Sequence, residues 1–293
     1  MQRTKPSNSL TRTKPGSLTN RGVANPDFRY MDWAGLELIK NNKPIFKQEP
    51  HYIDIETIEN FKIPEDWFLE KRIINSIHGV RHMMRSVIYA VNLSRYFGLN
   101  NVDRQALMVG SVLHDVRRMK DEGDSGHGLR SGQWLKNNLE LVNHTFGTVL
   151  DDNYLLKVCQ AIEFHEIPYA EMSTGQYTEY RKNRLLVDLL KTVDALDRYR
   201  LTWLNDWPKD KYMRAIPPDW IKHVAYNMVI RSEKVYLDKK DNRASIRELL
   251  QKNKTHNNRP AFARKYLQIT TSRTRYQNSN GRSLSFTKLK TVP

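Results

Sequence analysis

The sequence has almost no cysteine and no long hydrophobic run. Cys159 is the only cysteine among 293 residues, so no internal disulfide can form, and we expect a reducing, cytoplasmic setting. No apolar stretch approaches the roughly 18 residues that a membrane-spanning helix needs. Hydrophobic residues make up 39% and charged residues 27% of the chain. This balance is typical of a soluble globular protein with polar extensions.

Both ends of the chain lack acidic residues. Residues 1–26 carry five basic residues, and residues 252–293 carry ten. The net charge of +16 therefore comes almost entirely from the ends, because residues 27–251 hold 33 basic and 32 acidic residues. Both ends are rich in small polar residues and poor in large apolar ones, so we expect a disordered basic tail at 1–26 and a basic, mostly disordered tail at 252–293. Such tails could hold a nucleic acid.

The region between the ends lacks strand–helix alternation and internal repeats. Apolar residues recur there at three- and four-residue steps, which is typical of α-helices. The pattern predicts helices within 68–99, 101–119, 128–139, 152–165, 183–201 and 218–237. We therefore expect an all-α fold, with one helical domain over 27–251. Residues 27–68 are the least regular, and a short strand or hairpin fits the pattern at 43–58.

Histidines and aspartates fall at regular points of these helical patterns. The series consists of His78, His82, His114, Asp115, His127, His165 and Asp194. His78 and His82 are four residues apart, which would place them on one face of a helix. A helical bundle can assemble a metal site when successive helices each offer an imidazole or a carboxylate. Imidazole suits first-row transition metals (Mn, Fe, Co, Ni or Zn), and Asp115 could bridge two such ions.

A single histidine on an apolar helix is more often a core or surface residue than a metal ligand. We assign no role to the histidines outside the series, namely His51, His144, His223 and His256. The order of the series is what favours a metal site over chance. Its members would come from five successive helices, as a site built inside a bundle requires.

Three of these motifs resemble the HD-domain superfamily of metal-dependent phosphohydrolases. "IHGVRHMMRS" resembles its first ligand helix, "LMVGSVLHDVRR" its HD helix and "LLKTVDALDRYR" its last ligand helix. The similarity covers roughly residues 70–200. It implies metal ligands at His82, His114, Asp115 and Asp194, with His127 and His165 at the positions that two-metal members use. His82 then fills the family position, so we interpret His78 as a catalytic or substrate-contacting neighbour of the ligands, and ligation by His78 is the alternative.

The resemblance implies a helical bundle that holds one or two divalent transition-metal ions and hydrolyses a phosphoester through a metal-activated hydroxide. Asp115 would then take part in catalysis. A glycine-tyrosine-proline motif, which marks one cyclic-dinucleotide branch of the superfamily, is absent. A nucleotide or related small phosphate compound is the expected substrate, since the body of the chain is nearly neutral.

Phosphoryl transfer also requires cations near the charge that develops on the phosphate oxygens. Arg117, directly after the His-Asp pair, is the leading candidate for a phosphate contact, and Arg81 beside His82 is another. The turn "KDEGDSGHGLRS" places Asp124 and His127 at the rim of the expected site. We interpret Asp124 as a group that binds the substrate or supports a ligand, although ordinary turn chemistry and capping account for it slightly better.

Two other functions remain open at this stage. An HD-type nuclease, or a hydrolase associated with nucleic acid, would use the basic tails to hold a polymer, and its binding would weaken steeply with salt. A catalytically inactive HD bundle would act as a binding module. The complete ligand series favours an enzyme over the second alternative. The sequence leaves the oligomeric state open.

Overall fold

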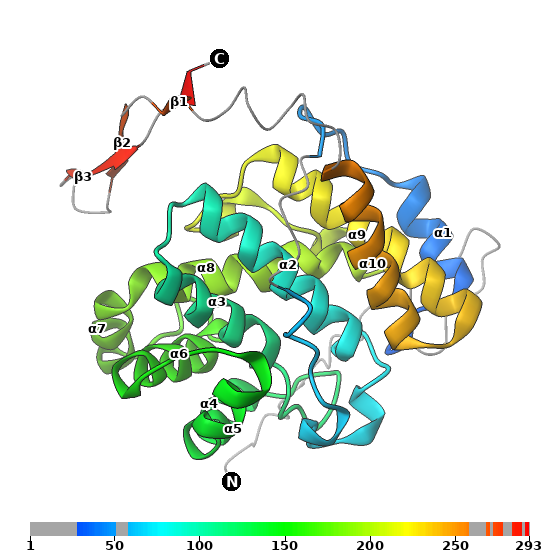
Figure 1. Cartoon of the computed structure of the whole chain (residues 1–293), viewed down its shortest axis with the longest axis horizontal. Coiled ribbons are helices and arrows are strands. Elements are labelled where there is room, and N and C mark those ends of the chain that lie inside the picture. Colours follow the sequence, from blue (N-terminus) through cyan, green and yellow to red (C-terminus); the bar gives the residue numbers. More distant parts are fainter. Residues whose placement is uncertain are drawn as a thin grey trace, which may run out of the picture.

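Helices form the body of the protein (Figure 1). The structure, a computed structural model, describes residues 28–50 and 58–257 and short strands beyond them, with side chains described up to residue 250. The helices are α1 (Trp33–Asn41), α2 (Val80–Tyr96), α3 (Asn101–Leu113), α4 (His127–Asn137), α5 (Leu139–Phe146), α6 (Asp152–His165), α7 (Thr174–Lys182), α8 (Arg184–Leu196), α9 (Asp219–Lys239) and α10 (Asn242–Asn257). Within 28–50 and 58–250 all regular structure is helical, which confirms the predicted all-α body. No helix in the described part has the length and apolarity needed to cross a membrane.

Four short strands follow the helical body. They are β1 (Gln268–Ile269), β2 (Ser272–Gln277), β3 (Ser283–Lys288) and β4 (Thr291–Val292). They form two antiparallel pairs, β1 with β4 and β2 with β3. The predicted tail at 1–26 lies outside the described residues, and so does most of the predicted tail at 252–293. Of the second segment the structure describes the end of α10 and these strands.

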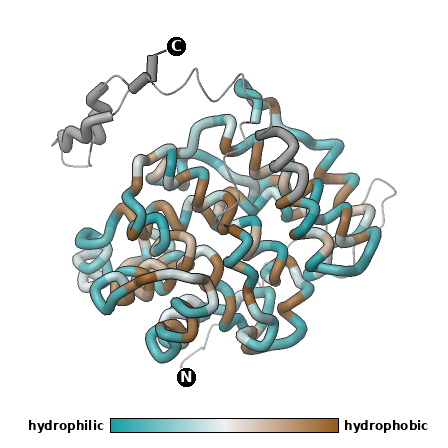
Figure 2. Tube along the Cα trace, in the orientation of Figure 1, coloured by the Kyte–Doolittle hydropathy of each residue, from teal (hydrophilic) through white to brown (hydrophobic). Residues whose placement is uncertain are grey.

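Helix α2 lies at the centre of the body, in contact with α3, α8 and α9. Every residue from Val80 to Ser94 is buried. Hydrophilic residues follow the outer turns of the molecule (Figure 2), yet α2 carries Arg81, His82 and Arg85 in the interior. Buried polar groups are costly unless they are paired. Arg81, His82 and Arg85 therefore need partners inside the body.

The structure corrects the predicted start of this helix. A helix was expected from residue 68, but α2 begins at Val80 and a 3-10 turn at Lys71–Ile73 precedes it. The Val80 N–H donates to the carbonyl of Ile74 at 3.0 Å, which folds the chain tightly across Gly79. A Cβ at Gly79 would lie 2.1 Å from that carbonyl oxygen, so only glycine fits. His78 thus precedes the helix and shares no helix face with His82.

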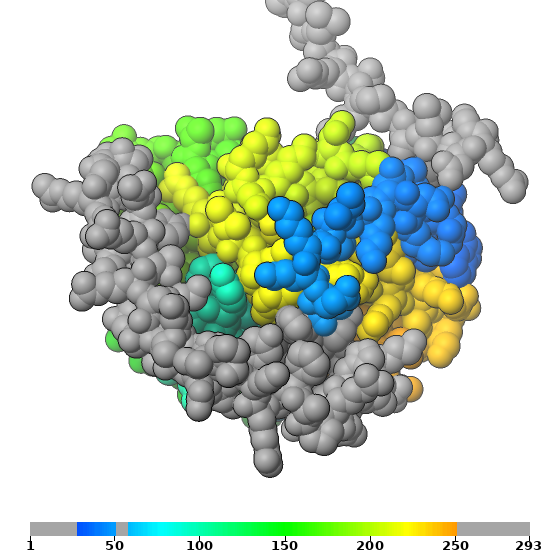
Figure 3. All heavy atoms as spheres, turned by 90° about the horizontal axis from the view of Figure 1, so that it is seen from above, coloured from blue at the N-terminus to red at the C-terminus, as the bar shows by residue number. Residues whose placement is uncertain are grey.

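The region that the sequence left unclear contains α1. The Asp32 side chain accepts a hydrogen bond from the Gly35 N–H and caps the start of this helix. No strand forms at 43–50 or at residue 58, and residues 51–57 lie outside the described part. The segment that follows α1 lies against α9, as the blue and yellow atoms of Figure 3 show. Its Lys47 and Gln48 N–H groups donate to Asp219 in the first turn of α9.

Helices α4 and α6 cross with their backbones in close contact. A Cβ at Gly128 would lie 2.5 Å from the carbonyl oxygen of Ile162, and one at Gly132 would lie 3.0 Å from that of Cys159. The first distance is shorter than a side chain tolerates and the second is tighter than most Cβ contacts, so glycine is required at 128 and favours the close crossing at 132. The crossing brings His127, the first residue of α4, beside His165, the last residue of α6.

Candidate metal centre

Six side chains of the metal-ligating type come together from different helices. They are His82 on α2, His114 and Asp115 at the end of α3, His127 at the start of α4, His165 at the end of α6 and Asp194 in the last turn of α8. All but Asp194 are buried. The Asp194 side chain is 31% exposed, so the cluster opens toward solvent on that side. The structure brings together every residue that the sequence analysis named as a metal ligand.

Four of these residues surround one point. The Nε2 atoms of His82 and His114 are 2.9 Å apart. Asp194 Oδ1 lies 3.6 Å from the first and 3.8 Å from the second. Asp115 Oδ2 lies 3.7 and 3.9 Å from the same two atoms. Metal–ligand bonds of ~2.0–2.2 Å separate neighbouring ligand atoms by about 3.0–3.5 Å. These residues could therefore hold one ion, at what we call the first position.

The other oxygen of Asp115 faces a second position. Asp115 Oδ1 lies 3.0 Å from His127 Nε2 and 3.7 Å from His165 Nε2, and these two nitrogens are 3.1 Å apart. Here a guanidinium also intrudes, because Arg118 Nη1 lies 3.1 Å from Asp115 Oδ1 and 3.2 Å from His127 Nε2. The second position thus offers three ligands and already holds a cationic side chain.

The four imidazoles share one orientation. Their Nδ1 atoms lie within hydrogen-bond distance of a carboxylate or carbonyl oxygen, namely Asp197 Oδ2 for His82, Ser111 O for His114, Asp124 O for His127 and Ile162 O for His165. A carbonyl oxygen can only accept, so Nδ1 carries the proton. In the neutral ring, Nε2 then presents a lone pair to the cluster. Second-shell bonds of this kind are typical of metal-ligating histidines.

Two pairs of Nε2 atoms therefore face each other closely, and neutral imidazoles would set lone pair against lone pair. The charges around them favour a cation. Burial opposes protonation of His127, but Asp115 outweighs it and raises the pKa of His127 to about 10. Asp115 and Asp194 raise the pKa of His114 in the same way. A proton on His114 and another on His127 could each bridge one pair, whereas a metal ion could also satisfy the carboxylate oxygens around each position.

The remaining ionisation states fit a metal site as well. Burial lowers the pKa of His82 to about 4 and also lowers that of His165, which keeps both rings neutral. Burial alone would raise the pKa of Asp115, but Arg118 and His114 hold it well below its ordinary value. The hydrogen bond and charge of His114 do the same for Asp194. Neutral imidazoles and ionised carboxylates are the forms that bind metals.

Asp197 is the main residue that the sequence analysis missed. It lies one turn after Asp194, is fully buried, and accepts the Nδ1–H of His82 at 2.8 Å. Arg85 donates to both of its oxygens at 2.6 and 2.8 Å, and the Tyr89 hydroxyl donates at 2.9 Å. These donors hold the pKa of Asp197 far below its ordinary value. The three-residue spacing from Asp194, which puts both on one helix face, was the available signal.

His78 lies beside the first position, and with His82 and Asp115 it forms a further group whose ligand atoms could hold an ion. Its Nδ1 lies 2.8 Å from Asp115 Oδ2 and 3.3 Å from an Arg200 nitrogen. Burial, with the charge of Arg118, lowers the pKa of His78 to about 3, so the ring is neutral. A neutral ring that donates to Asp115 fixes the bridging carboxylate. It is a weak base, and its geometry fits positioning better than proton transfer.

The three predicted substrate contacts have other partners. Arg81 is buried and binds Glu233 and Asn242, so its hydrogen bonds join α9 and α10 and do not reach the cluster. Arg117 donates to the Trp67 carbonyl, and its neighbour Arg118 is the one that enters the site. The reason is local. His114 still bonds four residues back, but the N–H groups of Val116 and Arg118 bond three residues back, so the side chains after the His-Asp pair no longer keep α-helical spacing.

Asp124 supports His127 from behind. Its carboxylate accepts from the Arg130 guanidinium and the Met119 N–H, and its carbonyl oxygen accepts from His127 Nδ1. Glu166 approaches the same ring atom at 3.0 Å and also accepts from the N–H groups of Gly126 and Gly128. Both carboxylates therefore hold the start of α4 in place, and neither is open for a substrate in this arrangement.

Lys191 and Arg200 add positive charge around Asp194, and the sequence analysis named neither. Lys191 lies three residues before Asp194 and donates to the carbonyls of His165 and Ile167 at 3.0 and 2.6 Å. Burial lowers its pKa to about 8. Arg200 is buried and donates to the Ile77 carbonyl at 2.6 Å, and its Nη1 lies 3.5 Å from Asp197. Lys191 and Arg200 thus place positive charge next to the cluster.

Comparison of the chain with models of protein families, with curated proteins and with solved structures found no match.

Proposed function

We propose that this chain is a metal-dependent phosphohydrolase of the HD-domain type, which cleaves a phosphoester of a nucleotide or related small phosphate compound. One observation carries the proposal. The two oxygens of Asp115 face two separate groups of converging imidazole Nε2 atoms, and the backs of those imidazoles are all fixed by hydrogen bonds. Such an arrangement is suited to divalent cations and has no evident purpose in a core without them.

The six candidate ligands would form two groups, one at each position, with Asp115 common to both. His82, His114, Asp115 and Asp194 would hold the first ion, and His127 and His165 would share Asp115 with a second. A divalent ion in such a site acts as a Lewis acid, activating water and neutralising charge on a phosphoryl oxygen. Imidazole and carboxylate ligands together favour Mn, Fe, Co, Ni or Zn over magnesium or calcium.

Other residues of the chain would receive the phosphate. Asp194 is the one partly exposed ligand, so a substrate would approach from its side. Lys191 and the buried Arg200 add positive charge near Asp194, and Arg118 lies at the second position. Preorganised cations of this kind stabilise the charge that develops in phosphoryl transfer. His78 would keep Asp115 oriented between the two positions.

The test combines metal analysis with a substrate panel. We expect the purified full-length chain to carry one or two equivalents of a transition metal, and Asp115→Asn to lose it. With the metal identified, a panel of nucleotides, sugar phosphates, cyclic dinucleotides and oligonucleotides is assayed for phosphate-ester cleavage. Turnover of a small phosphoester that falls by at least a thousandfold in Asp115→Asn would support the proposal. Turnover that is unchanged in the variant would overturn it.

The panel also separates the alternatives. Cleavage of oligonucleotides alone, with an affinity that falls steeply with salt, would favour a nuclease and give the basic ends a role. A metal-loaded chain that hydrolyses no member of the panel would be left as a binding module.

A further inference from the structure

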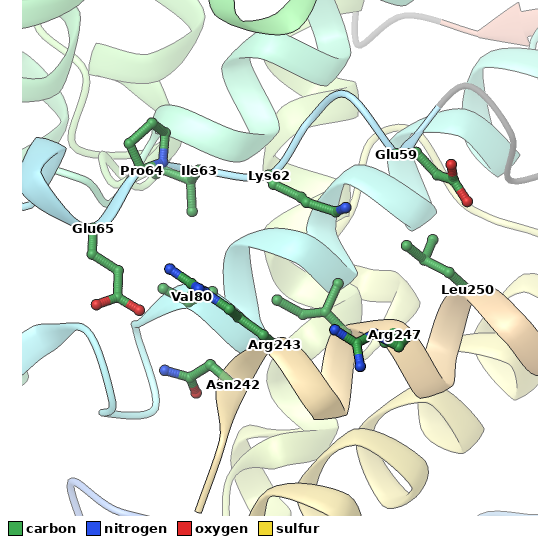
Figure 4. A pocket seen from close by; sticks show the side chains of 11 residues that line it. Glu59, Lys62, Ile63, Pro64, Glu65, Val80, Asn242, Arg243, Arg247 and Leu250 are labelled. Atoms are coloured by element: carbon green, nitrogen blue, oxygen red, sulfur yellow. The ribbon is translucent and has the colours of Figure 1, made fainter.

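A second pocket lies apart from the metal ligands. It has a volume of about 720 Å³ and lies between residues 59–65 and the beginning of α10 (Figure 4). None of its lining residues belongs to the cluster of six ligands. The volume falls within the range of small-molecule sites, about 300–1,000 Å³.

Three cationic side chains project into this pocket. Lys62 comes from one wall, and Arg243 and Arg247 come from α10, with Glu65 and Glu59 at opposite ends (Figure 4). All three cations are exposed, and within the described part of the chain none of them forms an ion pair. Arg243 and Arg247 are four residues apart on one helix face, where like charges repel and slightly destabilise the helix. An anionic ligand would remove that repulsion.

The floor of the pocket is apolar. Ile63, Val80, Ile246 and Leu250 line it and are buried. Guanidinium groups bind phosphate through paired hydrogen bonds, and an aliphatic floor accepts an apolar or planar body. The lining therefore fits a molecule that joins a phosphate to an apolar or planar body. An inorganic phosphate ion would leave the apolar floor uncovered.

A continuous series of buried hydrogen bonds joins the pocket to the metal centre. Asn242, which lines the pocket, accepts from Arg81 at 2.7 Å, and Arg81 donates to Glu233 at 3.0 Å. The other oxygen of Glu233 accepts from Arg85 at 2.6 Å. Arg85 binds Asp197, and Asp197 accepts the Nδ1–H of the ligand His82. We call this series the relay.

We propose that the pocket between residues 59–65 and α10 binds a small organic phosphate with an apolar or planar body, and that its occupancy supports His82 through the relay. A ligand held by Arg243 and Arg247 fixes the first turns of α10, where Asn242 begins the series. It thereby restricts the motion of Arg81, Glu233 and Arg85 and favours the His82 orientation that a metal needs. The effect on metal binding rests on the proposed function, whereas the binding site does not.

The binding test uses calorimetric titration of the full-length chain with ATP, octyl phosphate and inorganic phosphate. We expect octyl phosphate or ATP to bind at least tenfold more tightly than inorganic phosphate. The double variant Arg243→Gln/Arg247→Gln should weaken that binding at least tenfold. The matched control is Arg181→Gln, an exposed arginine in the last turn of α7, which should leave it unchanged.

A phosphate compound could also enter the metal centre, so Asp194→Asn serves as a second control. Binding that survives Asp194→Asn and is lost in the double variant belongs to the pocket. The reverse pattern, or equal binding by the double variant and the wild type, would overturn the proposal. Circular dichroism checks that α10 still forms, which we expect because both arginines are exposed. ATP binding without octyl phosphate binding would identify a nucleotide, and the opposite would identify an aliphatic phosphate.

Coupling is measured from the ligand side, because coupling between two binding sites is reciprocal. We expect octyl phosphate to bind about fivefold or more tightly to the metal-loaded chain than to the chelated chain. Glu233→Gln, which alters a middle member of the relay outside the pocket lining, should keep the binding and lose the difference. A difference that persists in Glu233→Gln would overturn the relay. If the chain binds no metal but still binds octyl phosphate in this pocket, the proposed function is refuted and the proposed binding site is not.

Discussion

Two buried polar regions meet at His82, and they are balanced in different ways. On one side, the relay pairs each donor with an acceptor, and Arg81 and Arg85 face Asp197 and Glu233 at 2.6–3.0 Å. On the other side, the Nε2 atom of His82 faces the Nε2 atom of His114 at 2.9 Å, with Nδ1 already donating on both rings. The relay is complete within the chain. In the cluster, the facing Nε2 atoms need a proton or a metal ion between them.

The relay and the cluster, which lie on the two sides of His82, therefore differ in what they need from solution. Buried ion pairs that are fully hydrogen-bonded require nothing more from solution. Converging acceptor atoms repel one another until a cation lies between them, and such a set of atoms is suited to bind one. Mutations in the relay should therefore act on folding whether or not metal is present, and mutations in the cluster should act through the metal.

The largest effect is expected from Asp197→Asn. The substitution keeps the shape of the side chain but leaves the buried Arg85 with a single charged partner. Removing one partner of a buried ion pair costs about 3–5 kcal/mol. We expect that loss in chemical denaturation of both the metal-free and the metal-loaded chain. Glu179→Gln, in an exposed pair with Lys182, is the control and should cost less than about 1 kcal/mol. Equal costs for Asp197→Asn and Glu179→Gln would show that the buried ion pair stabilises the fold no more than an exposed one.

The next effect concerns acidification of the metal-free chain. Burial lowers the pKa of His82 from 6.5 to about 4, so the unfolded chain binds more protons than the folded one between these values. Stability should then fall as the pH drops from about 6.5 to about 4, by about 3 kcal/mol from this group. Denaturation midpoints measured across this window test the prediction. His82→Gln should weaken the dependence of stability on pH in this window. An unchanged dependence would contradict the lowered pKa of His82.

The same chain should lose stability on the alkaline side for a different reason. Asp115 raises the pKa of His127 to about 10, so its contribution is complete below about pH 6.5 and is lost as the pH rises through about 10. The metal-free chain is therefore expected to be most stable near pH 6.5. Bound metal should remove the alkaline decline, because it takes the place of the proton.

A somewhat smaller effect is expected from metal itself. An ion that binds only the folded chain stabilises it by about 2.7 kcal/mol at a concentration one hundred times its Kd. The free energy of unfolding should rise with metal concentration in the wild type and in Glu179→Gln. In Asp194→Asn the increase should be much smaller, because the first position loses a charged ligand. A stability that is independent of metal in all three would show that the cluster is structural.

The smallest effect tests the difference between the two metal positions. Arg118 occupies the second position, 3.2 Å from His127 Nε2, and does not contact His82 or His114. We expect Arg118→Gln to tighten the second equivalent of metal about tenfold, or about 1.4 kcal/mol, and to change the first by less than threefold. Titration with elemental analysis measures both. Weaker binding of the second ion would mean that Arg118 supports that position.

The grouping of the candidate ligands could be predicted from the sequence, because the order of residues along the helical patterns carried the information. His114 and Asp115 end a helical pattern, and His165 ends another, so their placement followed from the spacing of apolar residues. The predicted helix at 152–165 agrees with α6 to the residue. All-helical architecture followed from the same periodicity.

The surroundings of the ligands could not be predicted in this way. Arg81 and Arg85 look like surface residues of an amphipathic helix, but α2 is covered on every side, so both are buried. Their partner Glu233 is about 150 residues away in the chain, and no local pattern links it to α2. The choice between Arg117 and Arg118 depended on the exact backbone turn after α3. Each of these outcomes is set by tertiary packing.

The close crossing at Gly128 has a consequence for how this site can evolve. Every possible replacement of that glycine carries a Cβ, which would lie 2.5 Å from the Ile162 carbonyl and push α4 away from α6. His127 and His165 stand on those two helices, so any such change would widen the gap between their imidazoles. Substitution of residue 128 would therefore change the distance between the two imidazoles, and with it the fit of an ion at the proposed second position.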